Sequence, residues 1–403
     1  MSTINEGSYA SIQFSLAWRS AEATHEERFL ARKANLWRDI FPPGFKDLLM
    51  GLGAGEGVRA SYAPGRGLPG REASRVVELP RRAFRGRSPS GRDITPRAGR
   101  FYPLGFFEGL PGVYPQDARP GRVLRADESL LRVDMGHPFA WRTLDVTAQV
   151  LEVRDKTSDT GGRISCWMEE LCDGGPGLQA RCEDGCPTDF ADADAMTRLD
   201  PSDDALFHET PRLVNHVDSG AAQVLREAAM RRVRPGTRVL DLMAGWRTHL
   251  DPCAGIHVTG LGMNAQELAA NPLLAERVVH DLNKSPLLPF PDASFDAVVC
   301  TLSIEYLIRP LEVVAECARV LAPGGELVIG FSDRWFPTKV PALWMDLHPF
   351  ERLGWVLDLL LRDGRFEGLW TFSDRNRWRP ADDPHIRQTF TGDPVFVAGG
   401  RRA

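Results

Sequence analysis

The sequence of 403 residues contains no uninterrupted apolar segment of about 18 residues, the length that a membrane-spanning helix needs. The opening residues, MSTINEGSYA, have neither the basic stretch nor the apolar run of a secretion signal. Seven scattered cysteines do not form the pattern of a disulfide framework. A net charge of −5 gives no overall attraction to nucleic acid or to a membrane. These absences predict a soluble cytoplasmic protein with reduced thiols and no nucleic-acid or membrane partner, and they say nothing about oligomeric state.

The length and the 43% apolar content are enough for two domains, each with its own core. Charge is uneven along the chain, because residues 59–132 are rich in arginine and residues 183–204 are rich in aspartate and glutamate. We interpret the first as a solvated basic face and the second as part of an acidic connector. The predicted organisation is an N-terminal domain over 1–155, a cysteine-containing linker over 156–205 and a C-terminal domain over 206–403.

The N-terminal part alternates short apolar segments with turns rich in glycine and proline, a pattern typical of a mainly antiparallel β domain. The predicted strands are 10–18, 57–64, 74–80, 121–127, 129–135 and 143–153. Residues 27–41 and 43–52 are predicted to be helical, and residues 83–112 to form a long irregular flap.

Two segments of this part resemble the FKBP-type prolyl isomerases. The stretch PPGFKDLLMGLGAGEGVRASYAP has the Pro-Gly-Phe helix and the following turn in matching places, at Gly44, Phe45, Leu48, Gly51, Gly55 and Glu56. RVDMGHPFAWRTLDVTAQVLEV is similar to the closing segment of the bacterial branch with an inserted chaperone flap, through Asp134, His137, Pro138, Ala140 and Leu144. Gly136 and Trp141 depart from that pattern. The resemblance implies an α+β, FKBP-like domain over 1–155. Whether it isomerises proline or serves only for docking or substrate gating stays open.

The predicted linker contains one short helix, near Trp167–Leu171, among turn formers and acids. Four of the seven cysteines occur there: Cys166, Cys172, Cys182 and Cys186. Four thiolates could hold zinc, but only the last pair has the spacing of a zinc knuckle. We therefore predict ordinary free thiols and no bound metal.

The C-terminal part alternates strands and helices in a regular βα rhythm. The predicted strands are 237–243, 257–263, 277–282, 295–302 and 325–332, followed late by 368–376 and 393–402. The predicted helices are 213–233, 265–271 and 310–322, with a further helical stretch over 344–361. Near-continuous apolar strands are covered on both faces, which indicates an α/β fold with a doubly wound sheet.

TRVLDL, HDLNKSPLLPFPDASFDAVVC and ARVLAPGGELVIGFS in this part resemble the class I S-adenosylmethionine (SAM) methyltransferases of type 11. The resemblance implies a seven-stranded, Rossmann-like sheet that binds SAM at the carboxyl ends of its first strands. It places Asp241 near the amino acid end of the cofactor, Asp281 at the adenine amino group and Leu282 against the adenine ring. The full set of cofactor-binding residues that it implies is Asp241, Ala244, Gly245, Trp246, Gly262, Met263, Asn264, Asp281, Leu282, Thr301 and Ser303.

Three positions depart from the family pattern. Met243 and Arg247 stand where the cofactor loop usually has glycine, and Gly262 stands where the second strand usually ends in the acid that holds the ribose. Asn264, two residues on, has an amide that could bond a ribose hydroxyl. Because Asp241, Asp281 and the order of elements persist, the sequence favours a divergent working site over a lost one.

The methyl acceptor is predicted from polar residues near the same strand ends. Arg212 and His216 are four residues apart, so a helix over this segment would present them on one face. His249, Tyr306 and Arg334 follow the first, fourth and fifth strands, and Glu305, Trp335 and Lys339 lie beside them. This set predicts a pocket for a small polar or anionic nucleophile, with Arg212, His216, His249, Tyr306 and Arg334 as the catalytic candidates.

A thiol or sulfide fits such a pocket, because a nearby His or Arg favours the thiolate. Nitrogen, oxygen and metalloid nucleophiles stay open. For Arg212 and His216 the competing interpretation is pairing with the linker acids Asp203 and Asp204. For the whole chain the competing function is a peptide-binding folding helper, in which the methyltransferase-like part is a non-catalytic scaffold.

Overall fold

The computed structural model describes the chain except for residues 1, 69–74, 158–162, 173–186, 192 and 253–254. The chain divides into two compact units. The N-terminal unit comprises residues 1–190, 346–354 and 372–378, and the C-terminal unit comprises residues 191–345, 355–371 and 379–403. The division at 190/191 lies inside the predicted linker 156–205. Among the described residues, no helix combines the length and the apolar character needed to cross a bilayer.

The main sheet of the N-terminal unit is antiparallel. In the order β2-β1-β8-β3 it consists of β2 (Ala23–Asn35), β1 (Ser8–Arg19), β8 (Leu144–Asp155) and β3 (Gly57–Tyr62), and residues 372–375 of β14 lie beside β2. Alternate residues of β1 are buried, as expected for a strand with one face on a core. The predicted strands 10–18, 57–64 and 143–153 are confirmed.

The predicted helix over 27–41 is wrong, because residues 27–35 belong to the strand β2 and the residues after them form a turn. β2 pairs with β1 from Asn35 opposite Tyr9 to Thr24 opposite Arg19. Its inward face carries two polar residues, His25 and Glu27, which hid the two-residue period in the sequence. Pairing along the whole of β1 outweighs the helix propensity of this charged segment.

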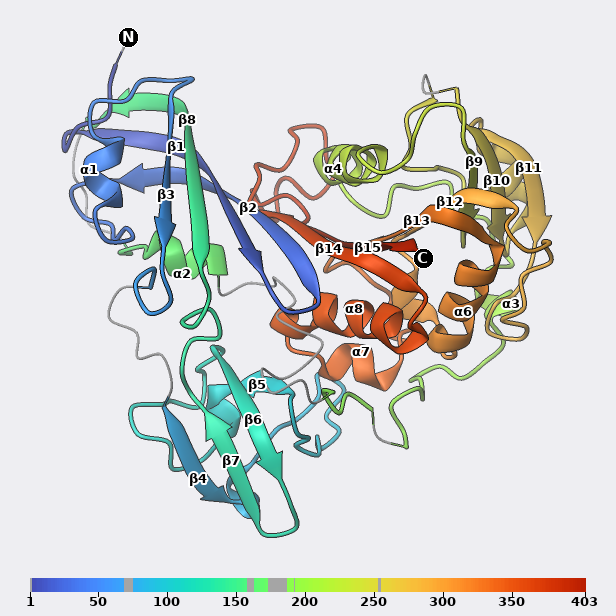
Figure 1. The fold of residues 1–403 in the computed structure, drawn as a ribbon, viewed down its shortest axis with the longest axis horizontal. Helices are drawn as coiled ribbons and strands as arrows, with labels where there is room; N and C mark the ends of the chain where they lie inside the picture. Colours follow the sequence, from blue (N-terminus) through green and yellow to red (C-terminus); the bar gives the residue numbers. More distant parts are fainter. Residues whose placement is uncertain (1, 69–74, 158–162, 173–186, 192, 253–254) are drawn as a thin grey trace. The chain divides into compact units, whose positions relative to one another are not determined.

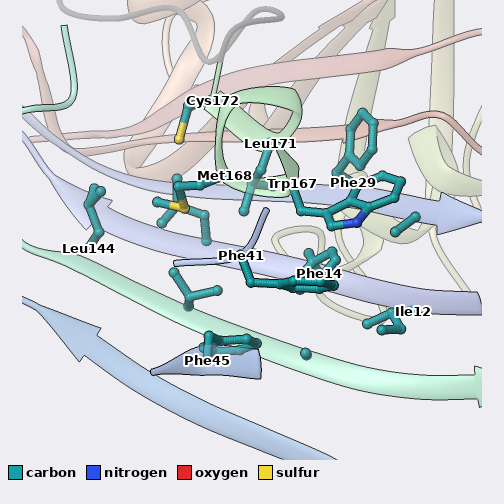
Figure 2. Close-up of a cluster of buried hydrophobic side chains, with 14 of the residues drawn as sticks. Ile12, Phe14, Phe29, Phe41, Phe45, Leu144, Trp167, Met168, Leu171 and Cys172 are labelled. Carbon is teal, nitrogen blue, oxygen red and sulfur yellow. The ribbon is translucent and has the colours of Figure 1, made fainter. Parts of the chain in front are cut away.

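A single core fills the space between this sheet and two short helices (Figure 2). α1 (Phe45–Leu49) and α2 (Trp167–Cys172) lie within the helical segments predicted from the sequence. The indole of Trp167 stacks near Phe14, with ring centroids 6.3 Å apart, and Met168 and Leu171 are buried beside it. The first part of the predicted linker therefore belongs to the N-terminal core.

A second antiparallel sheet is inserted in the sequence between β3 and β8 (Figure 1). Its order is β4-β7-β6-β5, formed by β4 (Val76–Pro80), β7 (Leu130–Asp134), β6 (Pro120–Ala126) and β5 (Phe101–Pro103). It has its own apolar cluster, in which Phe84 packs edge-on against Tyr102 and Phe107. The predicted strands of this insert are confirmed, and much of residues 83–112 is irregular as expected.

The sheet of the C-terminal unit has the order β11-β10-β9-β12-β13-β15-β14 (Figure 1). The strands β9 (Arg238–Leu242), β10 (His257–Gly262), β11 (Leu274–Val279), β12 (Phe295–Thr301) and β13 (Leu321–Phe331) are parallel. β15 (Val395–Arg402) pairs antiparallel with β13, and β14 (Phe366–Arg375) follows β15, with its residues up to 371 in this unit. This confirms the predicted doubly wound α/β fold.

Helices lie on both faces of this sheet. A side chain at Gly330 of β13 would touch Leu225 of α4 (Ser219–Met230), and one at Gly400 of β15 would touch Leu360 of α8 (Arg352–Asp363). Gly400 pairs with Leu327, three residues from Gly330, so the two glycines face opposite sides. The other helices of this part are α3 (Asp204–Phe207), α5 (Ala265–Ala270), α6 (Pro310–Val320) and α7 (Ala342–Asp346).

α4 begins at Ser219, six residues later than the sequence predicted. Asp218 is its N-cap, and its side chain accepts a hydrogen bond from the Ala221 amide at 2.9 Å. The same carboxylate accepts from the Asp393 amide at 2.6 Å, which anchors this end of the helix. Arg212 and His216 therefore lie in the loop before α4, and their predicted shared helix face is wrong.

The cysteine prediction is described only in part. Cys166 is half-buried and Cys172 is buried, whereas Cys182 and Cys186 lie outside the described residues. Within the described residues no group of three or more His, Cys, Asp or Glu side chains could hold a metal ion.

Candidate active site

The sheet order puts a topological switch point between β9 and β12, at the carboxyl ends of the two strands. From β9 the chain builds β10 and β11 on one side, and then crosses to β12 on the other side. In open α/β sheets such a switch point leaves a crevice between neighbouring connections, where ligands bind. The segments that leave β9 and β12 at this edge are residues 243–249 and 302–306.

Asp241 lies near the carboxyl end of β9 and is buried. The Thr248 hydroxyl donates to its Oδ2 at 2.5 Å, which is its one side-chain hydrogen bond among the described residues. Burial raises the pKa of the carboxyl group to about 7, and the Thr248 hydrogen bond opposes part of that rise. A buried carboxyl group with a single side-chain hydrogen bond and no ion-pair partner among the described residues suits a cationic ligand group.

The loop after Asp241 retains a glycine-like backbone conformation at Met243, where the family pattern has glycine. Met243 has φ of 58°, in the left-handed region that glycine adopts with least strain. The Ala244 amide donates to the Leu261 carbonyl at 2.8 Å, and Asn271 donates to the Gly245 carbonyl at 2.9 Å. The loop is thus held against β10 and the end of α5.

Gly262, at the end of β10, is required by this close approach. A Cβ atom at this position would lie 2.1 Å from the Ala244 carbonyl oxygen. The acid that the family pattern places here therefore has no room. Met263, the next residue, is half-buried.

Asn264 and Trp246 hold the segment before α4 in place. The Asn264 carbonyl caps α5 by accepting from the Gln266 and Glu267 amides, and its Nδ2 donates to the His208 carbonyl at 2.7 Å. The Trp246 indole donates to the Val214 carbonyl at 2.8 Å. The side-chain oxygen of Asn264 is therefore occupied, and one N–H of its Nδ2 is left for the predicted role at the ribose.

Asp281 and Leu282 follow β11 at the same edge of the sheet. Asp281 Oδ1 accepts from the amides of Asn283 and Lys284 at 2.9 and 3.2 Å, which fixes a turn, and Lys284 Nζ lies 3.8 Å from Oδ2. Leu282 is buried. An oriented carboxylate beside an apolar side chain is compatible with the predicted adenine site.

The segment after β12 meets the loop from β9. His249 Nδ1 and Thr301 Oγ1 are joined by a hydrogen bond of 3.0 Å, and the Ser303 hydroxyl donates to the Thr301 carbonyl at 3.0 Å. Removal from water, together with the smaller electrostatic effects of Arg226, His216 and Arg247, lowers the pKa of His249 to about 4. The imidazole is therefore neutral near pH 7.

Arg212, His216 and Tyr306 converge on the ring of Phe336. The ring centroids of His216 and Tyr306 lie 5.9 and 6.2 Å from that of Phe336. The Arg212 guanidinium lies 5.6 Å from the Phe336 centroid and 4.0 Å from that of Phe207. The sequence thus selected residues that do meet, although they meet around an aromatic ring that it did not single out.

Tyr306 is a neutral phenol in this cluster. Burial raises its pKa, and the neighbouring carboxylate of Glu305 raises it further. Its hydroxyl accepts a hydrogen bond from the Phe336 amide at 3.0 Å, which seats the aromatic ring.

The remaining candidates serve other contacts. Arg334 lies 3.8 Å from Asp393, which belongs to the group that anchors α4. Lys339 donates to the Ser202 carbonyl at 2.9 Å and lies 3.1 Å from Asp200.

The linker acids pair elsewhere than with Arg212 and His216. Lys284 binds Asp203 at 2.6 Å, and Arg198 binds Asp204 with both oxygens at 2.8 and 2.9 Å. The competing interpretation of Arg212 and His216 as partners of these acids is therefore wrong.

Residues 240–329 match the family model described as "Methyltransferase domain", which covers less than a quarter of the chain. A ubiquinone/menaquinone biosynthesis C-methyltransferase of Laribacter hongkongensis is 31% identical over 141 residues, 32% of this chain and 57% of that protein. The protein of the same name from Burkholderia mallei is 30% identical over 145 residues, 34% of this chain and 58% of that protein. The chain thus spans little more than half the length of these curated relatives.

Two solved structures are similar at lower identity. One is an S-adenosylmethionine-dependent methyltransferase from Mesorhizobium loti, with 19% identity, a TM-score of 0.32 and coverage of 45% of this chain and 99% of that one. The other is phosphoethanolamine N-methyltransferase 2 of Haemonchus contortus in complex with S-adenosyl-L-methionine, with 13% identity, a TM-score of 0.30 and coverage of 45% and 52%. This part of the chain is similar in sequence to methyltransferase domains, and S-adenosylmethionine is the cofactor against which its residues can be compared.

The residues present fit this cofactor. The buried, incompletely compensated carboxyl group of Asp241 suits the cationic ammonium group, and Asp281 with Leu282 suits the adenine. The sequence interpretation missed several residues that shape the site, namely Phe207, Thr248, Glu267, Asn271 and Phe336. Thr248 could have been found because it lies in the segment that follows β9. Asn271 could have been found because it directly follows α5. Nothing in the sequence indicates that Phe207 meets Phe336.

Proposed function

We propose that the chain transfers a methyl group from S-adenosylmethionine to a small-molecule nucleophile. The observation that carries this proposal is the convergence, at one edge of the sheet, of the Asp241 loop with the Phe336 cluster of Phe207, Arg212, His216, Tyr306 and Phe336. The Trp246 indole of the loop donates to the Val214 carbonyl at 2.8 Å and so links the loop to the segment that carries Arg212 and His216. A cofactor region next to a small cationic and aromatic region is the arrangement that methyl transfer requires.

The sulfonium of the cofactor supplies a methyl group already bonded to a good leaving group. The acceptor's lone pair forms the new bond to the methyl carbon while the carbon–sulfur bond breaks, so the main demand on the protein is alignment. His249 Nε2, which has no hydrogen-bond partner among the described residues, can accept a proton or a hydrogen bond from the acceptor. Its ring is already oriented by Thr301.

The acceptor is proposed to be polar or anionic, because the Arg212 guanidinium forms no ion pair among the described residues. The thiol or sulfide predicted from the sequence satisfies this requirement. A small anion against Arg212 would be held in the thiolate form. This would be S-methylation in a cytoplasmic setting.

A planar aromatic acceptor is the second candidate. Phe207, Phe336 and Tyr306 offer ring faces and edges, and the Phe207 and Phe336 centroids are 5.2 Å apart. The curated relatives are named as C-methyltransferases of ubiquinone and menaquinone biosynthesis, which supports an electron-rich ring carbon as the methyl acceptor.

The N-terminal region 1–155 is proposed to be an FKBP-like domain, followed by residues 156–205, whose first part packs in the N-terminal core, and by the methyltransferase domain over 206–403. The four-stranded insert between β3 and β8 supports this, because the resemblance implies a flap inserted into the main β domain. Peptide binding or prolyl isomerisation by this region is a second candidate function. A prolyl-isomerisation assay with the full chain and a short proline peptide tests it, and neither binding nor acceleration would remove it.

The test of the methyltransferase proposal measures S-adenosylhomocysteine formed from the cofactor, with sulfide, a small thiol and a hydroquinone as acceptors. Arg212→Ala and His216→Ala should each lower turnover at saturating cofactor by about one to three orders of magnitude, while cofactor affinity stays within a few-fold. Arg234→Ala is the matched control, because this exposed arginine precedes β9 at the opposite end of the strand. No binding of S-adenosylhomocysteine by the wild-type protein at millimolar concentration would overturn the proposal.

A further inference from the structure

Glu267 is a buried carboxylate beside the cofactor loop that the methyltransferase resemblance does not explain. It lies in the first turn of α5 and is 9% exposed. A Cβ atom built on Gly245 would lie 3.3 Å from Glu267 Oε2, so this oxygen reaches the loop directly after β9. Aliphatic residues are the usual occupants of so buried a helix position, and a carboxylate there needs a reason.

Only one of its two oxygens is used within the described part of the chain. The Arg212 amide donates to Oε1 at 2.7 Å, and the described residues contain no hydrogen-bond donor for Oε2. The charge of the carboxylate raises the pKa of His208 and of His216, against the larger lowering by burial. The second oxygen is therefore oriented toward the loop without a partner of its own.

A cofactor with a ribose needs such a group at this edge of the sheet. Carboxylates are the usual acceptors for ribose hydroxyls in nucleotide sites of α/β sheets, about 20 residues after the loop that follows the first strand. Position 262 cannot carry the carboxylate, because the Ala244 carbonyl fills the space that a side chain would need there. Asn264 offers no free acceptor there, because its side-chain oxygen already accepts the Gln266 and Glu267 amides.

We propose that Glu267 binds the ribose hydroxyls of the cofactor through Oε2. The family pattern has its ribose-binding acid at the end of β10, whereas this chain has Glu267 in the first turn of α5. From there the carboxylate would reach the ribose beside Gly245. The Arg212 amide fixes the rotamer by holding Oε1, so the same carboxylate connects the cofactor to the segment that carries the acceptor-binding Arg212 side chain. This proposal rests on cofactor binding by the methyltransferase domain.

The test is calorimetric binding of S-adenosylhomocysteine and of its 2′-deoxyribose analogue. The proteins are the wild type, Glu267→Gln and the control Glu276→Gln, which alters an exposed carboxylate on β11 that bonds His257 and Thr259. Glu267→Gln should weaken S-adenosylhomocysteine binding at least about tenfold, the usual effect of losing a hydrogen bond to a charged group. The control should bind within about twofold of the wild type.

The deoxy analogue separates ribose binding from a merely structural role. It should bind the wild type about tenfold more weakly than S-adenosylhomocysteine, and this difference should shrink to about twofold or less in Glu267→Gln. An equal difference in both proteins, or unchanged affinity in Glu267→Gln, would overturn the assignment while leaving the proposed function intact. Absence of binding by the wild type would instead defeat both.

Thermal unfolding checks that the variants fold. If Glu267→Gln does not fold, Glu267→Asp replaces it, because it keeps the charge and withdraws the oxygens by one methylene. The assignment then requires the same loss of discrimination between the two ligands. Retained discrimination in Glu267→Asp would count against it.

Discussion

Asp241 should make cofactor binding depend on pH through a single proton. In the free protein burial holds its pKa at about 7, against an ordinary value of 3.8. A cationic ammonium group beside the carboxylate would favour the charged form and bring the pKa back toward the ordinary range. A return of about three pKa units corresponds to about 4 kcal/mol of interaction that exists only for the ionised carboxylate.

The direction of the effect follows from which form binds. Below about pH 7 the free carboxyl group is protonated and must lose its proton before the ligand is bound, so affinity rises with pH until the free group is ionised. S-adenosylhomocysteine should therefore bind about tenfold more weakly at pH 6 than at pH 8. The His249 pKa of about 4 keeps that ring neutral throughout this window.

Calorimetry in buffers of different ionisation enthalpy measures the proton directly. The wild type should release about 0.9 proton per ligand at pH 6 and almost none at pH 8. Asp241→Asn, which keeps the shape of the side chain, should bind weakly and show no such difference. Equal wild-type affinity at both pH values, without proton release, would refute the account of Asp241.

In the unliganded protein, ionisation of Asp241 should also make the free energy of unfolding depend on pH. The folded state holds the Asp241 proton up to about pH 7 whereas the unfolded chain loses it near 3.8, so this contribution to the free energy of unfolding falls as pH rises between those values. His249 acts in the opposite direction, because its pKa is about 4 in the folded protein and 6.5 in the unfolded chain. Its contribution is lost as pH falls through that interval.

Three further predictions concern the frame of the site. Gly262→Asp, which restores the acid of the family pattern, should weaken S-adenosylhomocysteine binding at least about tenfold and lower the melting temperature, because its Cβ would collide with the Ala244 carbonyl; wild-type binding in this variant would contradict the described loop. Asp218→Ala should lower the free energy of unfolding in urea by about 1–2 kcal/mol through loss of the α4 cap, and an unchanged midpoint would contradict it. The purified protein should contain far less than one zinc per chain by elemental analysis, and serine at Cys182 and Cys186 should leave its stability nearly unchanged; stoichiometric zinc with unfolding on chelation would contradict the free-thiol prediction.

The sequence predicted the C-terminal sheet well because its strands carry their own signal. Segments such as 295–302 are nearly continuous apolar runs, and α6 begins at Pro310, a residue favoured in a first helical turn. β2 was missed because its buried face includes His25 and Glu27, which a hydrophobicity pattern counts as exposed. The Glu27 pKa, raised to about 8 by burial, shows how unusual that environment is.

The candidate site could be predicted as a set of residues, but not as a set of contacts. Asp241 and the neighbourhood of His249 follow from strand ends, which a linear pattern locates. The roles of Asn264 and Glu267 depend on where residues 208–212 cross α5, and that crossing involves positions 55 and 56 residues apart in the chain. Local propensities contain no information about such contacts.

The contact between Gly262 and the Ala244 carbonyl restricts the order in which this site can change. A lineage that carries Gly262 cannot regain an acid there by one substitution, because the 2.1 Å approach must first be relieved by moving residues 243–245. The opposite change, from an acid to glycine at position 262, has the same constraint. Residues 243–245 could pack against β10 only after the side chain at 262 was lost. The two positions are therefore epistatic, and glycine at 262 makes a carboxylate elsewhere, such as Glu267, harder to lose.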